Sequence, residues 1–375
     1  MRLHIITSTL LAFHLSALAL AATAAGPLQD GPAPPAEALS ALAPLVGAWD
    51  GVGVVRMSAT DQAGLAWSAT IDAEWILGGH ALREVTHVSF GDSLPPISME
   101  SLYTFDPNTQ RLAQCTVTAG SGMEVADLVH SPRPGVIVTL SKVLQDGHLT
   151  VMRSSMAFDG DSFRYVSHSA TDEAAAFEHI NGSFQRRAAT KHADHSRADH
   201  SHAAAASAPV ERPGAPTLSD ALAPLAPMLG VWDIAGSWTA GPDMPSIKIV
   251  AIDTIAPILD GSAMTIETRG GQEGQPFDYE AYLVAGWDEA AGAFRQVWSD
   301  NLGLAGTSLL YRLADGNFVA MRNGAEGGVP YSESTTLAVV DGKLSSVQTT
   351  RATGTLAPQA LFQGRYSARG TASNR

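Results

Sequence analysis

The sequence predicts an all-β fold of two tandem antiparallel β-barrels, each preceded by a short helix. Its 375 residues are enough for about two domains. One set of motifs occurs twice along the chain, and each occurrence is followed by short segments of alternating apolar and polar residues separated by turns. A duplicated β-rich domain accounts for all three observations.

The repeat keeps its register over a whole domain. The segment LAPLVGAWD at 42–50 returns as LAPMLGVWD at 225–233, and ILGG at 76–79 returns as ILDG at 258–261. The two pairs are offset by 183 and 182 residues. We therefore assign a first domain to 37–187 and a second to 217–370, joined by a linker at 188–216 that is rich in Ala, His, Ser and Pro.

Strict alternation identifies the strands. From Leu65 to Trp75 every second residue is apolar, and from Ser68 onward the residues between them are polar or charged. This pattern is typical of an antiparallel strand with one wet face. Similar segments predict roughly eight to ten strands in each copy. Because no long amphipathic helix separates them, we expect each copy to remove its exposed edges by closing into a barrel.

The first residues predict export. Arg2, an apolar stretch over 3–21 and the small residues Ala22-Thr23-Ala24 are typical of a Sec-type signal peptide. We expect 1–24 to be removed, which leaves a periplasmic or secreted protein with no transmembrane segment in the mature chain. The formal net charge of −14 excludes nucleic acid as a partner, since phosphate binding requires a positive surface.

The ends of each copy resemble the lipocalin-like barrels of the calycin superfamily. The motifs are Gly-x-Trp at the first strand and a last strand reading FQRR at 184–187 or FQGR at 362–365. The resemblance implies a structural pair in each barrel, in which a tryptophan closes one end and an arginine packs across it. The residues so implied are Trp49 with Arg186 and Trp232 with Arg365. More narrowly, WILGG at 75–79, YTFD at 103–106 and WSDNLG at 298–303 are similar to an uncharacterised family of exported bacterial lipocalin-like domains.

A second resemblance introduces haem as an alternative cofactor. The segment LAPMLGVW at 225–232 resembles the opening of nitrobindin-type haem barrels, in which a histidine just before the final strand ligates iron. The first copy offers His179 at that place, whereas the second copy has no histidine around Ala360. No other cofactor is predicted.

Two further groups of residues are candidates for chemistry. The linker histidines His192, His195, His200 and His202 could bind Zn²⁺ or Cu²⁺ weakly through neutral imidazoles, and a low-complexity spacer explains them equally well. The single cysteine, Cys115, excludes an intramolecular disulfide, and its repeat counterpart Val297 favours a buried position for it.

No motif identifies a catalytic centre. The GDSL tetrad at 91–94 matches a lipase signature, but it lies between two predicted antiparallel strands rather than after a parallel one. The sequence therefore favours a non-enzymatic binding protein for a small hydrophobic ligand, with Trp67, Trp75 and Trp298 as cavity residues. Two alternatives stay open: an envelope scaffold or interaction module whose barrels are filled by their own side chains, and a haem protein that uses His179. The oligomeric state is left open.

Overall fold

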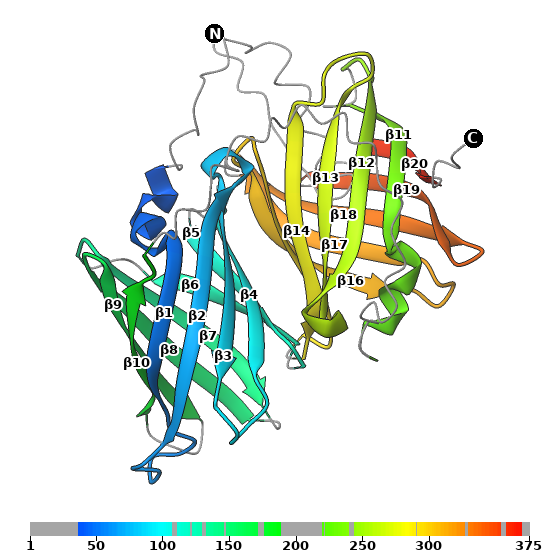
Figure 1. Ribbon diagram of the computed structural model, residues 1–375. Coiled ribbons are helices and arrows are strands. Elements are labelled where there is room, and N and C mark those ends of the chain that lie inside the picture. Colours follow the sequence, from blue (N-terminus) through cyan, green and yellow to red (C-terminus); the bar gives the residue numbers. More distant parts are fainter. Residues whose placement is uncertain are drawn as a thin grey trace, which may run out of the picture.

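The structure, a computed structural model, confirms the all-β fold of two closed antiparallel barrels of ten strands each (Figure 1). The ranges it describes are 37–106, 111–120, 122–129, 133–145, 148–171, 176–188, 220, 222–239, 244–289, 291–326, 329–353 and 358–369. The predicted signal peptide at 1–24 and the linker from 189 to 216 lie outside them. Within the described residues, no helix has the length and hydrophobicity needed to span a membrane.

The first barrel is a meander in which every strand pairs with its neighbour in sequence and the last strand pairs with the first. Each strand alternates between lumen and solvent, as the sequence pattern predicts. Its strands are β1 (Gly47–Val55), β2 (Leu65–Ile76), β3 (Ala81–Ser89), β4 (Ile97–Asp106), β5 (Arg111–Thr118), β6 (Gly122–Val129), β7 (Val136–Gln145), β8 (His148–Asp159), β9 (Ser162–Thr171) and β10 (Phe177–Arg186).

The second barrel repeats this order and closes in the same way. Its strands are β11 (Gly230–Trp238), β12 (Ile247–Ile258), β13 (Ala263–Gln272), β14 (Tyr279–Asp288), β15 (Ala293–Asp300), β16 (Ala305–Arg312), β17 (Phe318–Glu326), β18 (Val329–Val340), β19 (Lys343–Thr353) and β20 (Gln359–Ala368).

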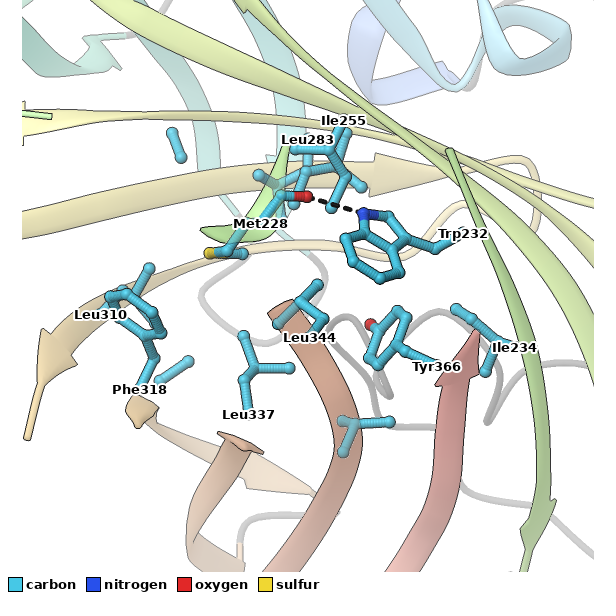
Figure 2. Close-up of a cluster of buried hydrophobic side chains, with 14 of the residues drawn as sticks. Met228, Trp232, Ile234, Ile255, Leu283, Leu310, Phe318, Leu337, Leu344 and Tyr366 are labelled. Carbon is cyan, nitrogen blue, oxygen red and sulfur yellow. Dashed lines mark hydrogen bonds between the residues drawn. The ribbon is translucent and has the colours of Figure 1, made fainter. Parts of the chain in front are cut away.

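A short 3₁₀ helix lies before the first strand of each barrel, η2 (Glu37–Leu45) in the first and η4 (Ala223–Met228) in the second. The large apolar side chains of both helices are fully buried in the barrel cores: Leu39, Leu42 and Leu45 in the first, and Leu225 and Met228 in the second. The indole nitrogen of Trp49 donates to the Leu45 carbonyl at 2.7 Å, and that of Trp232 donates to the Met228 carbonyl at 2.8 Å (Figure 2). Each helix therefore closes one end of its barrel and is held there by the tryptophan of the Gly-x-Trp motif.

The two barrels pack against each other through equivalent outer faces. An apolar cluster joins Leu102, Cys115 and Val117 of the first barrel to Val284 and Val297 of the second. Cys115 and Val297 occupy equivalent positions in the two copies, and both belong to this cluster. Cys115 is thus buried between the barrels rather than inside one, and burial raises the pKa of its thiol. A thiol in this state is a packing group rather than a nucleophile.

Polar contacts also cross this interface, and one of them joins a residue to its own repeat counterpart. The Ser262 hydroxyl accepts from the Gly120 amide at 2.7 Å, and the carbonyl of His80, the counterpart of Ser262, accepts from Ser299 at 3.3 Å. The Tyr282 hydroxyl donates to the carboxylate of its own counterpart, Glu100, at 2.5 Å. The duplicated chain therefore buries an interface of the isologous kind found in symmetric dimers.

Candidate ligand site in the first barrel

The interiors of the two barrels differ in one layer of side chains that the strand register makes directly comparable. In the first barrel, Ala73, Glu84, Ser101, Thr116 and Glu124 are successive partners across β2 to β6. The equivalent layer of the second barrel is Ile255, Ile266, Leu283, Trp298 and Gly306, across β12 to β16. The first four positions are thus small or polar in the first barrel and large and apolar in the second, whereas at the fifth position Glu124 corresponds to Gly306.

This difference decides whether solvent reaches the lumen. In the second barrel Ile266, Leu283 and Trp298 are at most 1% exposed. In the first barrel Glu84, Thr116 and Glu124 face inward from the same layer, yet each keeps part of its surface accessible. An inward-facing side chain in a closed barrel is accessible only where open space lies beside it.

A hydrogen-bonded group around Glu84 forms one wall of this lumen. The Tyr103 hydroxyl donates to Glu84 Oε2 at 2.7 Å, and the Thr86 hydroxyl donates to Oε1 at 2.8 Å. Gln114 Nε2 donates to the Tyr103 hydroxyl oxygen at 3.1 Å. Burial raises the pKa of the Glu84 carboxyl, and burial together with the Glu84 charge raises that of Tyr103.

A second group lies near it. The Tyr165 hydroxyl donates to the Ser154 hydroxyl at 3.0 Å, which in turn donates to Ser167 at 3.0 Å. Burial raises the pKa of Glu124, although its hydrogen bond with Ser141 opposes the change. Burial also raises the pKa of Tyr165, and the charges of both Glu84 and Glu124 add to that effect. Tyr165 is therefore within electrostatic reach of both lumen carboxyls.

Trp67 forms the apolar wall. Its ring packs against Phe184 with the centroids 5.7 Å apart and covers Gly53 and Gly182, where a Cβ atom would lie 2.4 Å from the indole. The glycines of β1 and β10 thus make room for this one side chain. The indole is 92% buried, and its Nε1 has no hydrogen-bond partner in the part of the chain that the structure describes. Trp75, on the same face of β2, is half-buried and packs against the core.

Trp298, the third tryptophan expected to line a cavity, occupies a different environment. It is packed over Gly306 in the core of the second barrel, with the Arg322 guanidinium carbon 5.7 Å from its ring centroid. Arg322 and Arg351 both pair with the buried carboxylate of Glu333, at 3.4 Å and 2.9 Å. Trp298 therefore fills the interior of its barrel instead of facing an open lumen.

The two tryptophan–arginine pairs implied by the lipocalin resemblance also differ. The Arg186 guanidinium carbon lies 4.1 Å from the Trp49 ring centroid, and its NH1 donates to the Val46 carbonyl at 2.6 Å. Arg365 is exposed, and Tyr366 packs on Trp232 instead, with the ring centroids 6.1 Å apart. The expectation for Arg365 is corrected by the register: Trp49 pairs with Arg186, but Trp232 pairs with Ala368, so alternation turns Arg365 outward.

The histidine candidates are placed as follows. His179 lies within the last strand of the first barrel, at an irregularity between Glu178 and Ile180, and its Nδ1 is 2.8 Å from the Arg56 carbonyl oxygen. Because Nδ1 is engaged in that contact, Nε2 is the ring nitrogen of His179 that would have to coordinate a haem iron. The linker residues His192, His195, His200 and His202 lie outside the described residues. Among the residues that are described, no three His, Cys, Asp or Glu side chains gather as a metal site would require.

The polar lumen residues were not singled out by the sequence analysis. Glu84, Gln114 and Tyr165 stand at inward positions, and each follows a large apolar inward residue two positions earlier on its strand, Leu82, Leu112 and Phe163. A polar residue on the apolar face of an alternating strand is the signal that could have found them. Ser93 of the GDSL tetrad is exposed in the connection from β3 to β4, as the sequence context indicated.

Comparison with known proteins gives only remote likenesses. No protein-family model matches the sequence, and no curated protein matches it. The crystal structure of Rv2717c from M. tuberculosis is 18% identical, covers 41% of this chain and 99% of its own, and has a TM-score of 0.33. A protein of unknown function of the DUF3598 family from Nostoc punctiforme PCC 73102 is 11% identical over 88% of this chain and 98% of its own, with a TM-score of 0.23. A candidate outer membrane protein from Bacteroides fragilis NCTC 9343 is 8% identical over 88% of this chain and 99% of its own, with a TM-score of 0.19.

Proposed function

We propose that this chain is an exported binding protein that holds a small, largely apolar molecule in the lumen of its first barrel. The observation that carries the proposal is the accessible surface on Glu84, Thr116 and Glu124, which face inward, while the equivalent residues of the second barrel are buried. Ligand sites are typically concave, mostly apolar and furnished with a few polar groups. The aromatic wall at Trp67 and the hydrogen-bonded carboxyl of Glu84 correspond to these two components.

The second barrel has a supporting role in this proposal. Its interior is filled by Trp298 and by the Arg322–Glu333–Arg351 cluster, and its outer face covers one side of the first barrel. In this proposal the second barrel is the filled scaffold, and the first barrel holds the ligand cavity. Export and the lipocalin-like ancestry of both barrels belong to the same proposal, and sequencing the amino terminus of the protein recovered from its compartment tests the export.

The binding proposal is tested by filling the lumen. Thr116→Trp introduces the residue that the second barrel carries at the same place, and combining it with Glu124→Gly reproduces the glycine on which that indole rests. We expect the wild-type protein to bind a solvatochromic apolar dye and to release a co-purified molecule in native mass spectrometry. The double variant should lose both, because the indole occupies the space that the ligand requires.

A matched control separates filling from a general effect of the added tryptophan. Ser68→Trp places the same indole on the exposed outer face of β2, and dye binding should not change. If the lumen-filled variant is folded by circular dichroism and binds the dye as the wild type does, the proposed site is wrong.

A further inference from the structure

The charges inside the first barrel are unbalanced. Glu84 and Glu124 face the lumen, and the described inward-facing residues of this barrel include one basic side chain, Arg186, which lies over Trp49 at the closed end and donates to the Val46 and Pro44 carbonyls. In the second barrel, Arg322 and Arg351 flank the inward carboxylate of Glu333, and the neutral Thr268 and Tyr366 donate to that of Asp253. Buried charges in proteins are normally paired, and an unpaired carboxylate in a closed interior is costly.

Two aromatic side chains lie near these carboxyls. Tyr103 is hydrogen-bonded to Glu84, and Tyr165 is within electrostatic reach of Tyr103 and of both carboxyls. The Trp67 ring covers Gly182, the residue that pairs with Tyr165 across β9 and β10. Aromatic faces attract organic cations, and clusters of such rings recognise ammonium groups.

The Trp67 indole supplies an independent sign of a ligand. Its Nε1 is a buried donor without a partner among the described residues, and such groups are uncommon because a buried polar group that makes no hydrogen bond is destabilising. The carboxyls of Glu84 and Glu124 would be matched by a positive group, and the Trp67 N–H by a hydrogen-bond acceptor, so a complementary molecule carries both.

We propose that the ligand of the first barrel is an organic ammonium compound, whose charged head lies between Glu84 and Glu124 against Tyr165 and whose apolar body carries an acceptor toward Trp67. This inference rests on the proposed function, since it names the class of molecule that the lumen takes. Burial raises the pKa of both glutamates. A bound cation stabilises their charged forms, so binding strengthens as pH rises and the carboxyls lose their protons.

Three probes of one shape test the charge. Para-methoxyphenethylammonium, para-methoxyphenethyl alcohol and para-methoxyphenylpropanoate each present an ether oxygen and an aromatic body, and differ in having a positive, neutral or negative head. Calorimetry with the full chain should show the ammonium binding at least about tenfold more tightly than the alcohol, with the propanoate weakest, because a hydrogen bond to a charged group is worth about 1.5–3 kcal/mol.

Variants of the carboxyls locate the effect. Glu84→Gln and Glu124→Gln should each bring the affinity for the ammonium toward that for the alcohol, and leave the alcohol unchanged within about twofold. Glu74→Gln removes a carboxylate from the exposed outer face of β2 and should change none of the three affinities. Thermal unfolding checks that each variant is folded.

The outcomes separate this inference from the proposed function. If the alcohol or the propanoate binds as well as the ammonium, or if the dye binds and none of the three probes does, the ligand is not a cation, and the lumen proposal stands. If neither the dye nor any probe binds the wild-type protein, the proposed function itself fails.

Discussion

The two barrels share strand order, closing helix and docking face, and differ in what fills them. Thr116 and Glu124 in the first barrel correspond to Trp298 and Gly306 in the second, where the indole rests on the glycine. The exchange is reciprocal, because a large ring in a packed interior needs a neighbour without a side chain. Gene duplication therefore conserved the scaffold that positions a lumen, and the lumen itself diverged through a few inward residues.

The buried charges diverged in the same direction. Glu333 is fully buried but lies between Arg322 and Arg351, and the Arg351 guanidinium also stacks 4.0 Å from the Tyr331 ring centroid. Glu84 receives hydrogen bonds only from the neutral groups Tyr103 and Thr86 among its described contacts. The second barrel therefore pairs Glu333 with its own arginines, whereas Glu84 has no basic partner among its described contacts.

The largest expected effect concerns packing. Trp298→Ala should lower the free energy of unfolding by about 3–5 kcal/mol, because it removes a fully buried ring from a filled core. Thr116→Ala, at the equivalent place in the first barrel, should cost only about 1–2 kcal/mol, because it removes no ring and only the hydrogen bonds of one hydroxyl to Ser101 and Gln114. Urea denaturation of both variants measures the difference. Equal losses of unfolding free energy for the two variants would show that the two interiors are packed alike, which would contradict the difference described between the barrels.

The next effect concerns pH. Burial raises the pKa of Asp253 and of Asp300, both in the second barrel, to about 7. Folding then favours the protonated carboxyls, so the stability they contribute is complete below the ordinary pKa of aspartate and is lost as pH rises through about 7. Between about pH 5 and about pH 7 each should reduce the free energy of unfolding by about 2 kcal/mol.

Asp253→Asn isolates one of these contributions. The raised pKa values of Glu84, Glu124 and Glu333 give slopes of the same sign, so the wild-type slope alone does not identify its source. Asparagine keeps a group beside Thr268 and Tyr366, which bond Asp253 at 2.7 and 3.2 Å, and removes the titration. A plot of the free energy of unfolding against pH should become less steep by the contribution of one titrating proton. An unchanged slope would show that Asp253 is already ionised in the folded protein.

The sequence was sufficient for the fold because its signals are local and repeated. Alternation over 65–75 and the recurring LAP…GxWD segment each specify backbone geometry that tertiary contacts do not override. The site was harder to predict, because it depends on which inward residues lie opposite one another. Strand pairing in a closed barrel brings Glu84 of β3 and Tyr165 of β9 within electrostatic reach, and no spacing along the chain shows this.

The two closing arginines are a different case, because alternation along one strand already separates them. Phe184 and Phe362 both face the lumen, so Arg186, two residues after Phe184, faces the lumen over Trp49, whereas Arg365, three residues after Phe362, lies on the outer face. The residue that matches Arg186 in the second copy is Gly364, so FQGR lacks the closing arginine of FQRR.

The smallest expected effect tests this distinction. Arg186→Ala should lower the free energy of unfolding by about 1–2 kcal/mol, because it removes a cation–π contact with Trp49 and the hydrogen bonds to the Val46 and Pro44 carbonyls that fasten the closing helix. Arg365→Ala should change it by less than about 0.5 kcal/mol, as is usual for an exposed side chain. Thermal unfolding of the two single variants and the double variant measures both terms. A loss for Arg365→Ala as large as that for Arg186→Ala would mean that the second barrel is closed by its arginine after all, and that the register reported for β20 is displaced.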